Sequence, residues 1–191
     1  MPDLDRSPAA DRARLIEIVK ARSFESGREV KLASGRTSTF YFNMKPTMLD
    51  AEGGLLVANL ILDQLHDVPA RWIGGLEMGA VPIAAAVAAV SPLRHRPVSA
   101  FFVRKQAKDH GTRSLIEGLA PGETLNGADV VVVEDVTTTG GSAIKAAEAV
   151  RAEGGKVVRV ITIVDRLEGA ADAFRAAGLE FVPLLTIADF R

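Results

Sequence analysis

Residues 130–142 read Val-Val-Val-Val-Glu-Asp-Val-Thr-Thr-Thr-Gly-Gly-Ser, and they combine the features of a strand, a loop and a helix start. Four consecutive valines favour a strand buried on both faces, as in a parallel sheet covered by helices. The small and hydroxyl-bearing residues 137–142 are typical of a loop that leads into a helix N-terminus. The segment therefore predicts one strand–loop–helix unit of an α/β protein.

The segments on either side of this unit repeat its pattern. Strands are predicted at 71–74, 98–103, 129–133 and 157–164, and helices at 81–90 and 142–153. The second helix ends at Gly154 and Gly155, and residues 118–127 are predicted to be a loop between two strands. Alternating strands and helices at this spacing predict the fold class: a doubly wound, mainly parallel sheet with helices on both faces.

The N-terminal third has a different character. Apolar residues recur at helical spacing in 12–21 and again in 55–65, so both segments are predicted to be amphipathic helices. Between them, residues 31–49 are rich in Ser, Thr and aromatic residues, and Gly35 marks a turn, which favours a short hairpin. We therefore expect a single domain over 1–191, with a small hood of about residues 22–50 together with C-terminal elements.

The composition excludes several classes of protein. Among 191 residues, 23 are Lys or Arg and 24 are Asp or Glu, so a net charge of −1 predicts neither a nucleic-acid-binding nor a membrane-surface protein. Cysteine is absent, which excludes disulfides, thiolate nucleophiles and zinc–thiolate sites. Residues 1–14 lack the apolar block of a secretory signal, and the apolar window 80–90 is too short for a bilayer. These features predict a cytoplasmic protein.

The acids and the loop of 130–142 have complementary chemical uses. Ligands of open α/β sheets bind at the carboxyl ends of the strands, where Glu134 and Asp135 can accept hydrogen bonds from a vicinal diol. Residues 137–142, the phosphate loop, can surround a phosphate at a helix N-terminus. A simpler interpretation makes Gly140-Gly141 an ordinary turn with Ser142 as the N-cap, but it does not explain two acids between four valines and three threonines. A ligand that carries both a vicinal diol and a phosphate is typical of ribose 5-phosphate, so the segment predicts a site for that group.

A second candidate lies in the basic segment, residues 104–111. Arg104, Lys105, Lys108 and His110 are four potential donors that follow the strand expected at 98–103, and they suit a polyanion such as diphosphate. Most charge runs are solvated loops, and the local charge alone leaves this alternative open. Its place after a strand, together with the ribose-phosphate motif, favours a functional role.

Four segments together resemble one family. Residues 131–142 look like the phosphoribosyl-diphosphate signature of type I phosphoribosyltransferases, and the basic segment resembles the mobile catalytic loop of orotate phosphoribosyltransferases. Ser34-Gly35-Arg36-Thr-Ser38-Thr-Phe40-Tyr41-Phe42-Asn43 resembles the orotate-site hood of that family, and Asp165-Arg166 matches the position whose arginine contacts orotate. The resemblance runs in collinear order over about residues 30–170, and four co-occurring motifs are far more specific than one.

The resemblance implies an activity and a set of site residues. The activity is transfer of ribose 5-phosphate from 5-phosphoribosyl 1-diphosphate (PRPP) to orotate, giving orotidine 5′-monophosphate and diphosphate in de novo UMP synthesis. It implies PRPP binding by Arg104, Lys105, Lys108, His110, Glu134, Asp135, Val136, Thr137, Thr138, Thr139, Gly140, Gly141 and Ser142, and orotate binding by Tyr41, Phe42, Thr138 and Arg166. The catalytic residues are expected to be Lys105, Lys108, His110 and Asp135.

The resemblance also implies a cofactor and a partner. Mg²⁺ is expected to bridge diphosphate and ribose oxygens, with no protein ligand assigned to it, and the protein is expected to form a homodimer with shared active sites. Two departures stand out: Ala33 and the stretch 75–79, Gly-Leu-Glu-Met-Gly, lack lysines that many members carry. Direct lysine contacts to diphosphate at those places therefore do not carry over.

Several alternatives remain open from the sequence. A phosphoribosyltransferase for another nucleobase would keep the acids and the phosphate loop but has no reason to keep the basic segment or Arg166. A non-catalytic regulator that senses PRPP would need a basic nucleic-acid face or an added domain, which the charge and length disfavour. Arg166 also has a simpler interpretation as a surface ion pair with Asp165 or Glu168, and alternate members of 40–42 are expected to pack inward.

Overall fold

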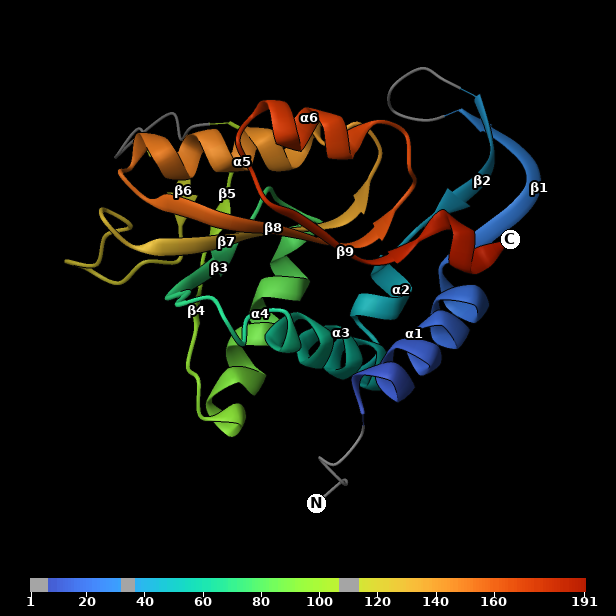
Figure 1. Cartoon of the computed structure of the whole chain (residues 1–191), viewed down its shortest axis with the longest axis horizontal. Helices are drawn as coiled ribbons and strands as arrows, with labels where there is room; N and C mark the ends of the chain where they lie inside the picture. The colour runs from blue at the N-terminus through green and yellow to red at the C-terminus, as the bar shows by residue number, and fades with distance from the viewer. Residues whose placement is uncertain (1–6, 32–36, 107–113) are drawn as a thin grey trace.

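The computed structural model describes residues 7–31, 37–106 and 114–191, which are arranged around a five-stranded sheet (Figure 1). The strand order is β4-β3-β7-β8-β9, and every neighbouring pair is parallel. The strands are β3 (Trp72–Gly74), β4 (Ser99–Ala100), β7 (Asp129–Thr137), β8 (Lys156–Asp165) and β9 (Phe181–Thr186). The predicted parallel sheet is confirmed.

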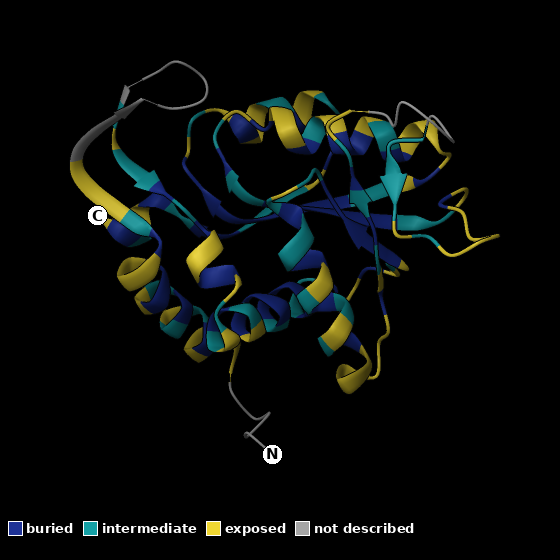
Figure 2. Ribbon diagram, turned by 180° about the vertical axis from the view of Figure 1, so that it is seen from behind, coloured by how far each residue is buried: buried dark blue, intermediate teal, exposed yellow. Residues whose placement is uncertain are grey.

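Helices cover both faces of this sheet, as predicted. One face carries α1 (Pro8–Arg22), α3 (Ala51–Asp63) and α4 (Ala80–Val90), and the other carries α5 (Gly141–Ala152) and α6 (Ala170–Ala176). Val131 and Val133 pack toward the first set of helices, while Val130 and Val132 pack toward the second. In Figure 2 the middle of the sheet is mostly dark blue, and yellow residues lie on the outer sides of the helices that cover it. Because alternate side chains point to opposite faces, one run of valines serves both cores.

The order of the strands reverses between β3 and β7. The chain passes from β3 to β4 on one side, and β7 then pairs with β3 on the other. Consecutive strands thus lie on opposite sides of β3, and in open α/β sheets ligands bind at the carboxyl ends of the strands at such a reversal. The helices that follow β3 and β7, α4 and α5, cover opposite faces and leave this edge accessible.

The hood is an antiparallel hairpin of β1 (Phe24–Lys31) and β2 (Thr37–Phe42), followed by α2 (Lys45–Met48). The hairpin was expected within 31–49, so the position of its first strand is corrected toward the N-terminus. The rings of Phe24 and Phe42 contact Phe190 at 5.4 and 5.1 Å between centroids. Phe190 belongs to the C-terminal turn η2 (Ile187–Phe190), so the hood packs against the C-terminal turn that follows β9 (Figure 1).

The segment 98–103 also differs from its prediction as one strand. β4 pairs with β3, whereas β5 (Phe102–Val103) forms a separate antiparallel pair with β6 (Ile116–Glu117). The Val103 N–H still donates to the carbonyl of Gly75 at 2.8 Å, so the backbone continues alongside the chain that follows β3. β5 therefore connects the main sheet to a small antiparallel pair, whose two strands flank the basic segment in the chain. The predicted loop at 118–127 lies between β6 and β7.

No helix in the described part of the chain is long and apolar enough to cross a membrane.

Candidate active site

The site lies where β7 extends beyond β3. Pairing of β3 with β7 ends at Gly74 opposite Val132, but pairing of β8 with β7 continues to Asp165 opposite Thr137. The strand expected to end at residue 133 is therefore longer, and Glu134 and Asp135 lie within it rather than after it. β8 supplies the hydrogen-bond partners that the extra residues need, and the side toward β3 is left to the loop that follows Gly74.

A cavity of about 250 Å³ opens at this end of β7. It is lined by Glu134, Val136, Thr137, Thr138, Thr139, Gly140, Gly141, Ser142, Ala143 and Lys145. The structure thus brings together nine residues between positions 134 and 143, eight of them predicted for PRPP, and adds Lys145 one turn into α5. At the N-terminus of a helix the first backbone N–H groups lack intrahelical partners, so this cavity suits an anion.

Gly140 shapes the turn from β7 into α5. Its φ of +84° lies in the left-handed region, and a Cβ there would come within 3.0 Å of the Phe174 ring. Glycine adopts this conformation without the steric cost that other residues pay. The first glycine of the Gly-Gly pair is therefore required by both conformation and space, whereas a Cβ on Gly141 would meet nothing within 4 Å.

Glu134 is a buried acid at the floor of this cavity. It is 8% exposed, and its Oε2 has no hydrogen-bond partner in the described structure. Burial, followed by the neighbouring carboxyl of Asp135, raises the pKa of Glu134 to about 9, although the charge of Lys105 acts in the opposite direction. Glu134 therefore carries a proton near neutral pH and offers a donor as well as an acceptor to a bound hydroxyl.

Asp135 faces the loop between β3 and α4 and does not line the cavity. A Cβ on Gly79 would lie 2.7 Å from Asp135 Oδ1, so Gly79 allows the loop backbone to approach this carboxylate. The Val136 N–H also donates to Oδ1 at 2.8 Å. No side chain fits at position 79 without a shift, which agrees with the absence of a lysine there.

The same loop holds the start of the basic segment. Glu77 accepts a hydrogen bond from the Lys105 N–H at 2.8 Å, and the Glu77 N–H donates to the carbonyl of Val103 at 2.8 Å. Arg104 lies 3.7 Å from Glu117 across the base of the β5–β6 hairpin. Lys105 is exposed and close enough to influence Glu134. The predicted donors Lys108 and His110 lie outside the described residues.

Arg166 follows β8 and is buried, not part of a surface pair. Its side chain is 3% exposed, and its Nε donates to Glu168 Oε1 at 2.8 Å. Nη2 donates to Ser38 Oγ of the hood at 3.0 Å, and the guanidinium lies 4.4 Å from the centroid of the Phe40 ring. The Arg166 N–H donates to the carbonyl of Thr137 at 3.0 Å, which joins this group directly to the phosphate loop.

The three aromatic residues of β2 divide between the two faces of the strand. Phe42 is 5% exposed and packs in the ring cluster with Phe24 and Phe190, so only its backbone remains for a ligand. Phe40 contacts Arg166, and Tyr41 lies between them on the opposite face of the strand. The orotate-binding roles of Tyr41 and Phe42 remain predictions.

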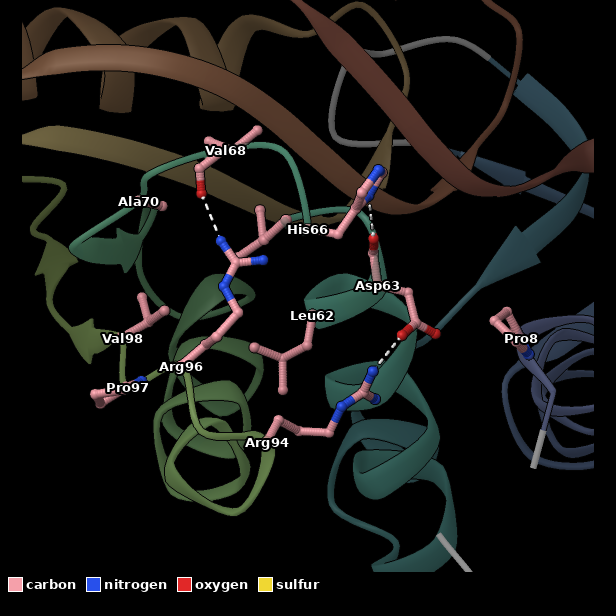
Figure 3. Close-up of a pocket in the computed structure, with 11 residues that line it drawn as sticks. Pro8, Leu62, Asp63, His66, Val68, Ala70, Arg94, Arg96, Pro97 and Val98 are labelled. Atoms are coloured by element: carbon pink, nitrogen blue, oxygen red, sulfur yellow. Dashed lines mark hydrogen bonds and ion pairs between the residues drawn. The ribbon is translucent and has the colours of Figure 1, made fainter. Parts of the chain in front are cut away.

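A larger cavity, of about 470 Å³, lies at the other end of the molecule (Figure 3). Its lining includes Val68 and Ala70, which precede β3, and Val98, which precedes β4. Two arginines at its edge are already engaged: Arg94 donates to Asp63 at 2.5 Å, and Arg96 donates to the carbonyl of Val68 at 3.0 Å. Since this cavity lies at the N-terminal ends of the strands, the smaller one at β7 is the candidate active site.

Sequence reasoning did not assign several residues that the fold places at the site. Lys145 lines the cavity, Glu77 holds the Lys105 backbone, and Ser38, Phe40 and Glu168 surround Arg166. Ser38 and Phe40 fall within a motif that the sequence singled out, and Glu168 follows Arg166 by two positions. These local signals were present, but only the fold shows that they meet.

Comparison with known proteins agrees with this site. A phosphoribosyl transferase domain matches residues 51–173 and thus spans the sheet from α3 to α6, including the phosphate loop. The fold and the site therefore define a phosphoribosyltransferase.

Individual relatives are similar over nearly the whole chain. Orotate phosphoribosyltransferase of Rhodopseudomonas palustris (strain BisB18) is 59% identical over 96% of this chain and 98% of its own length. That of Bradyrhizobium diazoefficiens is also 59% identical, over 96% of this chain and 98% of its own length. A crystal structure of the Mycobacterium tuberculosis H37Rv orotate phosphoribosyltransferase in complex with PRPP is 38% identical, with a TM-score of 0.75 over 94% of this chain and 98% of that one. The chain belongs to the orotate phosphoribosyltransferase family.

Proposed function

We propose that this protein transfers ribose 5-phosphate from PRPP to orotate, giving orotidine 5′-monophosphate and diphosphate in UMP synthesis. The observation that carries this proposal is that two binding groups, Arg166 and the phosphate loop, are neighbours in the structure. The Arg166 N–H donates to the carbonyl of Thr137 at 3.0 Å, so the residue that carries a buried guanidinium lies beside the first residue of the phosphate loop. A guanidinium suits the carboxylate of orotate, and the helix N-terminus suits the 5′-phosphate of PRPP.

The reaction exchanges one bond for another at the anomeric carbon. A ring nitrogen of orotate forms the new bond, while the bond from that carbon to the diphosphate oxygen breaks and the diphosphate leaves with the electron pair. Such displacements pass through an oxocarbenium-like state, so the protein contributes orientation and neutralisation of the leaving group. No covalent nucleophile is needed.

The described residues divide these tasks. The phosphate loop, with Lys145 beside it, holds the 5′-phosphate, and Glu134 lines the same cavity. We assign the ribose hydroxyls to Glu134 and to Asp135, which lies on the side of the β3–α4 loop. Lys105, whose backbone is held by Glu77, is placed at the start of the basic segment that neutralises the departing diphosphate, together with Arg104, Lys108 and His110. Arg166 and the hood residues Tyr41 and Phe42 receive orotate, with Thr138 between the two substrates.

Mg²⁺ fits the donor chemistry of the site, because a carboxylate such as that of Asp135 offers the hard oxygen ligands that it prefers. Within the described ranges, however, no three His, Asp or Glu side chains gather as a metal centre. We therefore place the ion chiefly on oxygens of PRPP and water. When bound, it supplies positive charge against the diphosphate.

The test is the ultraviolet loss of orotate on adding PRPP and Mg²⁺, with uracil, hypoxanthine and adenine in parallel. We expect turnover of orotate alone. Turnover of another base in place of orotate would favour the alternative of a sister enzyme, and PRPP binding without turnover of any base would favour a regulator.

We further propose a homodimer whose basic segments act in the partner's site. An inactive Lys108→Ala/His110→Ala variant is mixed with an inactive Glu134→Ala/Asp135→Ala variant after subunit exchange has been verified. Each mixed dimer then holds one site with both defects and one intact site, and random exchange restores roughly a quarter of wild-type sites under two-fold symmetry. No recovery after verified exchange would mean that the segment serves its own subunit.

A further inference from the structure

Arg166 is oriented by a specific set of contacts. Both its Nε and its Nη2 lie close to a single oxygen of Glu168, at 2.8 and 2.7 Å from Oε1. The other contact of Nη2 is with Ser38 Oγ at 3.0 Å, and Phe40 packs against the plane of the guanidinium. No described residue accepts a hydrogen bond from Nη1. Glu168 thus holds one edge of a buried guanidinium and leaves the donors of Nη1 for another acceptor.

An arginine within β8, the strand that precedes Arg166, shows how one guanidinium accommodates two carboxylates. Arg159 near the start of β8 has its Nε and Nη2 at 2.9 and 2.7 Å from Glu180 Oε1, the same geometry as the Arg166–Glu168 pair. Its Nη1 and Nη2 also donate to the two oxygens of Asp67, at 3.2 and 3.5 Å. One guanidinium therefore serves one carboxylate on each edge, as its planar fork of five donors allows.

We infer that Glu168 is the positioning residue for substrate recognition: it fixes the Nε edge of Arg166 so that the Nη1 edge faces the carboxylate of orotate. The inference rests on the proposed function. The orotate carboxylate then accepts from Nη1 of Arg166, as Asp67 accepts from Nη1 of Arg159. Glu168 does not touch the substrate in this arrangement. It acts through Arg166, with Ser38 and Phe40 preventing rotation of the guanidinium out of its plane.

The charge and the burial of Arg166 explain why its guanidinium needs a carboxylate beside it. A guanidinium whose side chain is 3% exposed is costly to leave without a carboxylate, and a single oxygen partner at the Nε edge stabilises it before substrate arrives. Glu168 itself is 25% exposed, so it keeps part of its hydration. The site is therefore preorganised for a second anion on the opposite edge, which lowers the ordering cost of binding.

The test compares Glu168→Ala with Glu168→Gln in the full-length protein. Glu168→Ala removes the acceptor, and we expect the KM for orotate to rise by about tenfold, the effect of misplacing one charge-assisted hydrogen bond. The KM for PRPP and kcat at saturating orotate should stay near wild type. Glu168→Gln retains an amide oxygen at the same distance along the side chain, so it should recover most of the orotate affinity.

A matched control comes from the second pair. Glu180→Ala removes the equivalent carboxylate from Arg159, far along β8 from the site, and should leave both KM values unchanged. Competition by uracil, which lacks the carboxylate, should be the same in wild type and Glu168→Ala. Thermal unfolding of each variant shows whether it is folded.

Three results would overturn the inference: an orotate KM that is unchanged or lower in Glu168→Ala, equal increases in the two KM values, or equal effects of the Ala and Gln substitutions. Its failure is distinguishable from failure of the proposed function. If wild type does not consume orotate, the proposed function fails. If wild type consumes orotate and Arg166→Ala raises its KM but Glu168→Ala does not, only the role of Glu168 fails.

Discussion

Replacing Glu134 by Gln should make the protein progressively more stable than wild type as the pH rises. Burial and the adjacent Asp135 raise the pKa of Glu134 from 4.5 to about 9, so the folded acid pair holds a proton that the unfolded chain releases above about pH 5. Between these values the folded state binds more protons than the unfolded state, and wild-type stability falls with pH. The stabilising contribution is complete below pH 4.5 and is lost as the pH approaches 9.

The size of the expected difference in unfolding free energy follows from one proton that is bound in the folded state and released on unfolding. One pH unit corresponds to about 1.4 kcal/mol for a proton bound in only one state, so the difference between variant and wild type should grow by about 2.7 kcal/mol from pH 6 to pH 8. If the free energy of unfolding falls by about 2 kcal/mol per molar urea, the urea midpoints of the variant and of wild type should move apart by roughly a further 1.3 M between pH 6 and pH 8. Burial also raises the pKa of Asp165, but Asp165 is present in both proteins and cancels in the difference.

The assay is urea unfolding at pH 6, 7 and 8 and at one protein concentration, since self-association would stabilise both proteins by mass action. Glu148→Gln, at an exposed position on α5, controls for the loss of a surface charge. A difference between Glu134→Gln and wild type that stays constant or shrinks from pH 6 to pH 8 would refute the buried proton.

Three further predictions concern substrate binding and local conformation. Asp135→Asn should lower kcat/KM for PRPP by roughly tenfold to 150-fold, since each charge-assisted hydrogen bond to a ribose hydroxyl contributes about 1.5–3 kcal/mol; near-wild-type kinetics at limiting PRPP would contradict this. Arg166→Ala should raise the KM for orotate far more than that for PRPP in steady-state assays, and equal changes would make the residue structural. Gly140→Ala should cost about 1–3 kcal/mol in unfolding, because it forces a left-handed φ and crowds Phe174, whereas Gly141→Ala should leave stability near wild type.

Local pattern was enough to predict the centre of the fold. The four valines are each fully buried, and their alternation between the two cores is the consequence expected of a strand with helices on both faces. The helices α1, α3, α4 and α5 were also predicted near their observed positions, because each carries its own run of apolar residues, and Gly154 and Gly155 mark the end of α5. The phosphate loop was predictable for the same reason: its residues are consecutive in the chain.

Elements that depend on a neighbour for their pairing were not predictable. β9 contains Pro183, which cannot donate to a ladder, and it forms at the edge of the sheet because β8 is there to pair with it. β1 is polar and contains Gly27, and pairing with β2 holds it extended. β7 extends to Thr137 because β8 continues beside it beyond the end of β3.

The sequence by itself thus determined the strand, the phosphate loop and the presence of an acid pair and an arginine with the right chemistry. Only the tertiary structure decided how they meet. Gly79 lies against Asp135 across 56 positions of the chain, and Ser38 reaches Arg166 across 128. Contacts at such separations depend on which strands become neighbours and on where their ladders end. Local periodicity carries no information on either, which is why the contacts of Arg166 with Ser38 and Glu168 emerged only from the fold.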